Sequence, residues 1–194
     1  MLQSASPSPQ QLRSRGASRL TKVVKRPWPM PEVLGRSVSL SPATRLYVEG
    51  DTIRSVFVIS RGVVRLEQSH PSTGRLIARF LGVSSALGVA DALLGGSYSW
   101  SAVALTDCQV EPLVVEHFHR LRQTERTVAA WVEHTLAREV RKFSDWVSHR
   151  GLRDAEERLA WTVTQLRLAF GWRQPAVSIR LAFPIQLRQL ADAA

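Results

Sequence analysis

The side chains with the clearest capacity for chemistry are few and scattered. His117 and His119 are separated only by Phe118, a spacing that also occurs in metal sites. A metal ion needs further ligands that converge on it in space, and Glu125 is the only suitable acid shortly downstream. The pair also lies where the sequence pattern changes from that of a strand to that of a helix. We therefore interpret both histidines as surface residues and expect neither a metal site nor a cofactor.

Cys108 is the single cysteine of the chain. It excludes an intramolecular disulfide and a cluster of cysteine ligands for zinc or iron–sulfur. Its simplest role is that of a small buried apolar side chain in a cytoplasmic protein. No Ser/His/Asp set, phosphate-cradling glycine loop or pair of acids suggests catalysis, so the sequence does not favour an enzyme.

The net charge of +10 is unevenly distributed along the 194 residues. Residues 1–31 contain six bases and no acid, whereas residues 80–119 contain four acids and neither Lys nor Arg. The basic ends suit a polyanionic partner such as nucleic acid, and the acidic middle does not. No apolar run approaches the ~20 residues that span a bilayer, so we expect no membrane association.

Residues 1–31 are rich in Ser, Pro, Gln and Arg and poor in apolar side chains. That composition predicts a disordered basic tail. Two alternatives stay open: translation starts at Met30, or the segment is an Arg- and Ser-rich transit peptide.

Residues 44–115 have the sequence pattern of a β-domain. Short segments rich in β-branched and aromatic residues recur at spacings of ~8–12 residues, separated by turn signals such as Gly50-Asp51 and Arg61-Gly62, which predicts a sandwich or barrel. The predicted strands are 45–49, 53–60, 63–68, 75–81, 100–105 and 109–115, with a possible short helix over 90–94.

From about residue 116 the pattern becomes helical, with one apolar stripe that extends over about seven turns. Such a stripe needs a partner, either the β-domain or a second copy of the same helix, and its length favours a dimer seam. The stripe consists of Val128, Val132, Leu136, Val140, Phe143 and Val147, widened by Trp131 and Trp146.

Gly151 interrupts this helix, and a second apolar stripe follows, formed by Leu152, Ala155, Leu159, Val163, Leu166 and Phe170. Gly171 suits the position just after a helix C-terminus. Beyond it we expect a short strand over 177–181 and a helix that starts after Pro184 and continues over 185–194.

The order of these elements resembles the Crp/Fnr family of bacterial transcription regulators. The resemblance covers residues 32–194 and rests on several stretches in the expected order: Tyr47–Asp51, Ser60–Leu66, Arg79–Gly82 followed by Gly88, Ala92–Leu94, Ala102–Cys108, Leu152–Ala160, and Phe183-Pro184 through Asp192. It implies an α+β chain with a cyclic-nucleotide-binding-type β-roll (a jelly roll), a long dimerisation helix and a winged helix-turn-helix.

The resemblance also implies an effector pocket around a short cassette, formed here by Gly88, Val89, Ala90, Tyr98 and Ser99. Members of the family that bind nucleotide have a Glu just after the glycine and an Arg just before the serine. This chain has Val89 and Tyr98 at those positions, and neither can replace the missing charge. Arg65 or Arg75 would have to reach in from elsewhere, so we expect weak or no binding of cyclic AMP. Tyr98 and Trp100 could instead line a pocket for an uncharged effector, or Trp100 could simply pack inside the roll.

The resemblance divides the chain into the tail, a roll over 32–123, a dimerisation helix over 124–150 and the start of the DNA-binding domain over 151–194. The expected partners are DNA, a second copy of the chain and an unidentified small-molecule effector. Gln186 and Arg188 could touch phosphate, and the helix that reads bases would begin just beyond Ala194.

Three alternatives remain. The chain could be a stand-alone sensor or interaction domain that never binds DNA. It could be a cupin-type metalloenzyme, because cupins are also β-rolls. It could sense haem, as some relatives of the family do, although the spacing of His70, His134, His149 and Cys108 does not mark a haem ligand.

Overall fold

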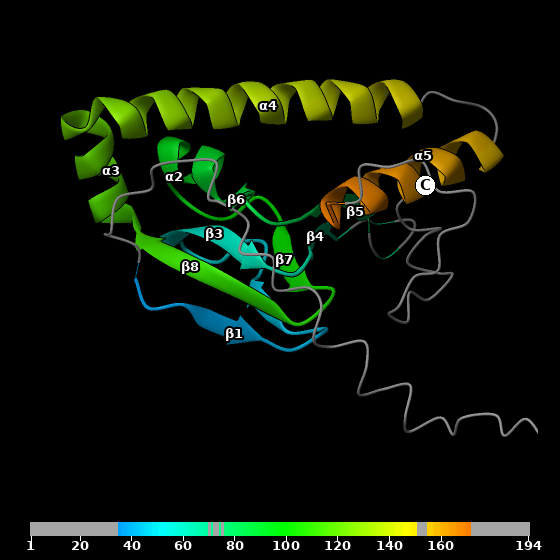
Figure 1. Ribbon diagram of the computed structural model, residues 1–194, viewed down its shortest axis with the longest axis horizontal. Helices are drawn as coiled ribbons and strands as arrows, with labels where there is room; N and C mark the ends of the chain where they lie inside the picture. Colours follow the sequence, from blue (N-terminus) through cyan, green and yellow to red (C-terminus); the bar gives the residue numbers. More distant parts are fainter. Residues whose placement is uncertain (1–34, 70, 72–73, 75, 151–154, 172–194) are drawn as a thin grey trace, which may run out of the picture.

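The structure, a computed structural model, describes residues 35–69, 71, 74, 76–150 and 155–171. In these residues, two four-stranded antiparallel sheets face each other, and a long helix crosses above them (Figure 1). The sheet orders are β1-β8-β3-β6 and β2-β7-β4-β5. The strands are β1 Val38–Leu40, β2 Arg45–Tyr47, β3 Ser55–Arg61, β4 Val64–Gln68, β5 Leu76–Leu81, β6 Ala86–Leu87, β7 Ser101–Ala104 and β8 Cys108–Val114.

The core of the roll lies between the two sheets and is built from β-branched residues, which suit a pleated and buried surface. Val56 and Ile59 of β3, Val64 of β4 and Val110 of β8 are fully buried there. The turn at Gly62 connects β3 to β4 as expected. Its φ is +88°, and a Cβ there would come within 2.7 Å of the Cys108 Sγ, so a side chain has neither the conformation nor the space it needs.

Two short strands, β1 and β6, were not predicted. β1 pairs with β8 through three residues, and β6 pairs with β3 through two. Neither is long enough to produce an alternating pattern. The strand expected over 177–181 and the helix expected over 185–194 lie outside the described residues.

The helices of the described residues are α2 Val89–Leu94, α3 Val115–Thr124, α4 Arg126–Arg150 and α5 Ala155–Ala169. The helical region expected from residue 116 is divided at Glu125, whose backbone is extended (φ −112°, ψ 106°). No proline or glycine marks this break. Phe118 of α3 and Val128 of α4 are both buried, so the division lets two differently directed helices pack on the same roll (Figure 1). None of the described helices is long and apolar enough to cross a membrane.

α5 packs against the other end of the roll, beside β5 (Figure 1). The stripe predicted for this helix is only partly the face that it buries. Leu166 is fully buried and Thr162 nearly so, whereas Leu159 is 42% exposed. The roll contacts one side of the C-terminal half of the helix, so the buried face is narrower than the apolar pattern.

Candidate functional site

The predicted cassette begins at Gly88, which precedes α2. The φ of Gly88 is +75°, in the left-handed region, and a Cβ at this position would lie 2.9 Å from Cε1 of Tyr98. Glycine is therefore required for the backbone conformation and for the close approach of the Tyr98 ring. The next residue, Val89, is buried in the core of the roll and presents no polar group.

Tyr98 is 3% exposed, and both its side chain and its backbone form hydrogen bonds. Its hydroxyl donates a 2.6 Å hydrogen bond to the Ser55 carbonyl and accepts one of 3.3 Å from the Ser55 N–H. Its backbone N–H donates to the Asp51 carbonyl, and its carbonyl accepts from the Gly50 N–H, each at 2.9 Å. The ring stacks on Tyr47 with the centroids 3.8 Å apart. Tyr98 is thus a fixed part of the core.

Burial raises the pKa of Tyr98, and it also raises the pKa of Tyr47. Desolvation is the largest cause in both cases, because a phenolate is costly to remove from water. Asp91 adds to both shifts through its negative charge. The positive charge of Arg79 acts in the opposite direction on the pKa of Tyr47, so charges of both signs surround the two rings.

The remaining cassette residues face outward. Ala90 and Ser99 are exposed, and the Ser99 hydroxyl donates a 2.6 Å hydrogen bond to the Asp91 carboxylate. The five predicted pocket residues therefore do not converge on one space: Gly88, Val89 and Tyr98 are brought together, and the other two are not. Trp100 is half-buried and packs against the core.

Arg65, one of the two arginines that could have supplied a cation to the cassette, does not point toward it. Arg65 alternates along β4 with Val64 and Leu66, which are core residues, so it points to the opposite face of the sheet. There it forms a buried ion pair with Glu67, with 2.8 Å between Nε and Oε2. Arg75 lies outside the described residues.

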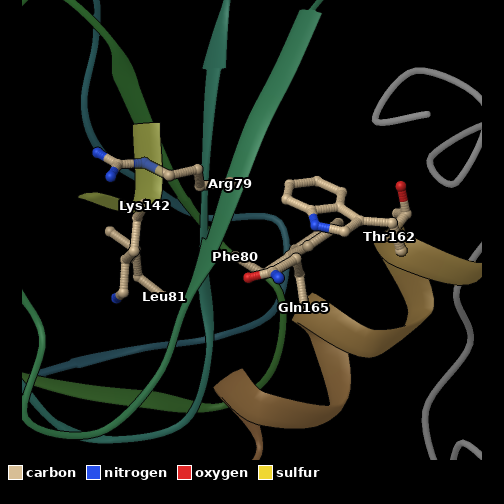
Figure 2. Close-up of a pocket in the computed structure, with 7 residues that line it drawn as sticks. Arg79, Phe80, Leu81, Lys142, Thr162 and Gln165 are labelled. Carbon is tan, nitrogen blue, oxygen red and sulfur yellow. The ribbon is translucent and has the colours of Figure 1, made fainter. Parts of the chain in front are cut away.

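The sequence did not indicate that Arg79 contacts a helix. Arg79 pairs in register with Leu66 of β4 and forms an ion pair with Glu139 of α4. Figure 2 shows its guanidinium directed from β5 toward the α4 segment that carries Lys142. Tyr47 and Ser55, the partners of Tyr98, were also missed. Each lies more than 40 residues from Tyr98 in sequence, so no local pattern connects them.

Two cavities of the described residues lie away from the cassette. One, of about 30 Å³, is lined by residues of β5, α4 and α5 (Figure 2). The other, of about 150 Å³, is lined by residues near β1 and β8, including Arg61 and Cys108. Neither is lined by Gly88, Val89 or Tyr98, which agrees with the tight packing of Tyr98 against the glycine.

The apolar stripe of α4 divides in two. Trp131 and Val132 are buried in the core of the roll, and Leu136 is half-buried against it. Val140, Phe143 and Val147 are 70%, 52% and 50% exposed. The apolar side chains of the first half of the helix are thus buried on the roll, whereas those of the second half stay exposed, although Glu139 and Lys142 of that half contact β5.

The other candidate residues show no site. His117 is exposed, and His119 is half-buried beside the Phe118 ring. Among the described residues, no three His, Cys, Asp or Glu side chains are grouped to hold a metal ion. Gln186 and Arg188 lie outside the described residues.

Residues 37–125 match the family profile of the cyclic nucleotide-binding domain. FixK2 from Bradyrhizobium japonicum superposes with a TM-score of 0.67 at 23% identity, covering 81% of this chain and 75% of that one. The c-di-GMP responsive global regulator CLP of Xanthomonas campestris gives 0.65 at 15% identity, covering 81% and 78%. A transcriptional regulator of the CRP family from Thermus thermophilus gives 0.54 at 21% identity, covering 68% and 62%. No curated protein matches the chain by sequence.

Proposed function

Because residues 37–125 form a domain of the cyclic nucleotide-binding family in a chain with the fold of Crp/Fnr-type regulators, we propose that this protein is a DNA-binding transcription regulator of that type whose roll does not bind cyclic nucleotides. The observation that carries the second part is the position of Tyr98, which packs directly on the cassette glycine and bonds to Ser55.

A cyclic nucleotide would meet two obstacles in this cassette. Its phosphate would be buried beside Val89 and Tyr98, in a stretch of forty residues without Lys or Arg, and a buried unpaired anion is strongly unfavourable. Its entry would also displace the Tyr98 ring and break both hydrogen bonds to Ser55. In this proposal, the Tyr98 side chain occupies the space beside Gly88 that a nucleotide would need.

We further propose that the protein is a homodimer and that the second half of α4 is the seam. Val140, Phe143 and Val147 continue the stripe that the first half of α4 buries on the roll, and all three are exposed in the single chain. The Phe143 and Trp146 rings lie 5.4 Å apart and widen this surface. A symmetric partner helix would cover the whole strip at once.

DNA binding is assigned to residues 151–194, with Gln186 and Arg188 as backbone contacts. The net charge of +10 supports a polyanionic partner. A dimer of such domains reads two related half-sites. The remaining parts of the proposal follow from the family: the protein acts in the cytoplasm, is not an enzyme, and responds to an effector that enters somewhere other than the cassette.

Calorimetry tests the roll. The full chain is titrated with cyclic AMP and with cyclic GMP, and a cyclic nucleotide-binding protein serves as the positive control for ligand quality. We expect no heat of binding for either nucleotide. A dissociation constant in the micromolar range for either would show that the roll is a nucleotide receptor and that Tyr98 moves aside.

Fluorescence anisotropy tests DNA binding. DNA fragments are enriched from a random library with a protein that has an intact C-terminal domain, and their binding is measured at increasing salt concentration. We expect sites with two-fold symmetry and an affinity that falls steeply with salt. If no fragment is enriched and random DNA binds equally weakly, the stand-alone interaction domain is the better description.

A further inference from the structure

One strand, β5, touches three different parts of the molecule. Leu81 is buried in the core of the roll, whereas Phe80 belongs to a separate buried cluster that faces α5. Arg79, one residue earlier, forms the ion pair with Glu139 of α4. A movement of β5 within the roll would therefore change the contacts of both α4 and α5.

A small apolar cluster joins the roll to α5. Val63, Phe80 and Leu105 of the roll enclose Leu166, which is fully buried, and Ala169 and Phe170 pack at its edge. We call the roll surface formed by Val63, Phe80, Gly82 and Leu105 the α5 seat. Burial of Leu166 and the neighbouring apolar surface removes that surface from water and so favours the docked position of α5.

Gly82 gives the seat its shape. A Cβ at this position would overlap the carbonyl oxygen of Ala169 and lie 2.7 Å from its carbonyl carbon. The three nearest atoms all belong to Ala169, so the obstacle is the backbone of α5. The φ of Gly82 is not in the left-handed region, so its backbone conformation within the roll does not require glycine. Only the docked helix requires it.

The adjoining cavity is not large enough to be an effector site. It measures about 30 Å³, which is room for about one water molecule. Two cations, Arg79 and Lys142, lie at its edge, and burial lowers the pKa of Lys142. The cavity lies where β5, α4 and α5 meet, so the side chains of these three elements do not fill the space between them. Loosely packed regions open locally more easily than the core.

We propose that the α5 seat is an intramolecular docking surface that holds α5 in one position on the roll, and that Gly82 is the residue that permits the docking. The regulatory consequence rests on the proposed function: a shift of β5 would reposition α5, the first helix of the segment to which DNA binding is assigned. The seat would thus transmit a change in the roll to the output of the protein.

Hydrogen exchange of the full chain tests the seat. An isolated helix of 15 residues is marginal in water, so amides of α5 exchange rapidly once the helix is undocked. For Gly82→Ala we expect α5 amides to exchange roughly tenfold faster or more, while β3 and β8 keep their protection. Val83→Ala is the matched control, because Val83 is the exposed neighbour in the same turn, and it should leave both unchanged.

Leu166→Ala tests the seat from the helix side, since it leaves every residue of the roll intact. We expect the same selective loss of α5 protection. If α5 stays as protected as in the wild type in both variants, the proposal is wrong. If Gly82→Ala loses the protection of β3 and β8 together with that of α5, Gly82 serves the roll itself and its assignment to the seat is wrong. Failure of the protein with an intact C-terminal domain to bind DNA would contradict the proposed function and would not alter these exchange results.

Discussion

The hydroxyl of Tyr98 donates a 2.6 Å hydrogen bond to the carbonyl oxygen of Ser55, 43 residues earlier in the chain. This bond fixes the residue that ends the cassette loop to the first residue of β3. The ring between them covers Gly88 and stacks on Tyr47. The side chain of Tyr98 therefore connects the cassette to β3 and to Tyr47.

Removal of the Tyr98 hydroxyl should destabilise the roll without opening it. Tyr98→Phe retains the ring but removes the hydroxyl that bonds to the half-buried Ser55, and loss of a typical hydrogen bond costs about 0.5–1.5 kcal/mol. Tyr98→Ala should cost about 3–5 kcal/mol, because it leaves a cavity. Urea unfolding measures both. Ser99→Ala, which loses only the exposed bond to Asp91, is the control and should change stability by less than about 0.5 kcal/mol. Equal stability of Tyr98→Phe and wild type would contradict the role of the bond.

Stability should fall at alkaline pH. Burial raises the pKa of Tyr98 and of Tyr47, so the folded state holds these protons more tightly than the unfolded chain. The stabilisation is complete below the unfolded tyrosine pKa of about 10 and is lost as pH rises through the folded values. Urea unfolding between pH 8 and 11, in a Cys108→Ala background that removes the thiol titration, measures the slope. Tyr98→Phe in that background should have a shallower slope; an identical slope would contradict the assignment.

Phe143→Asp should dissociate the dimer and leave the roll folded. Phe143 is 52% exposed in the single chain, so a charge there is tolerated by the monomer and strongly opposed in an apolar seam. We expect the dimer dissociation constant to rise at least about 30-fold, measured by analytical ultracentrifugation. Leu94→Asp is the control, because Leu94 is an exposed apolar residue on α2, 85% exposed and outside α4. A Phe143→Asp chain as dimeric as the wild type would exclude this seam.

Cys108 should be inert toward thiol reagents in the folded protein. It is 1% exposed, its thiol donates to the Val63 carbonyl at 3.2 Å, and burial raises its pKa. Both access and the thiolate form that reacts are therefore suppressed. We expect a disulfide reagent to modify it at least about 100-fold more slowly than in urea, since reaction must wait for opening of the core. Rapid modification of the native chain would point instead to a redox-sensitive position.

Local patterns predicted the elements whose signals are local. Alternating β-branched residues gave the longer strands near their observed bounds, and the four-residue spacing from Val128 gave α4. Gly88, with Val89 and Tyr98 at the charged positions, was identified from its place in a familiar order. The strands β1 and β6, and the break at Glu125, were missed, because each depends on contacts with distant parts of the chain.

The sequence by itself predicted a β-roll followed by amphipathic helices, and it predicted a cassette with Val89 after Gly88 and Tyr98 before Ser99. Only the tertiary structure decided how these side chains pack. Hydrophobic periodicity shows that a face is apolar but does not name its partner, so the structure alone divides the α4 stripe between the roll and a free surface. The same holds for the contacts of Tyr98 with Ser55 and of Gly82 with Ala169, which depend on how the sheets and α5 pack.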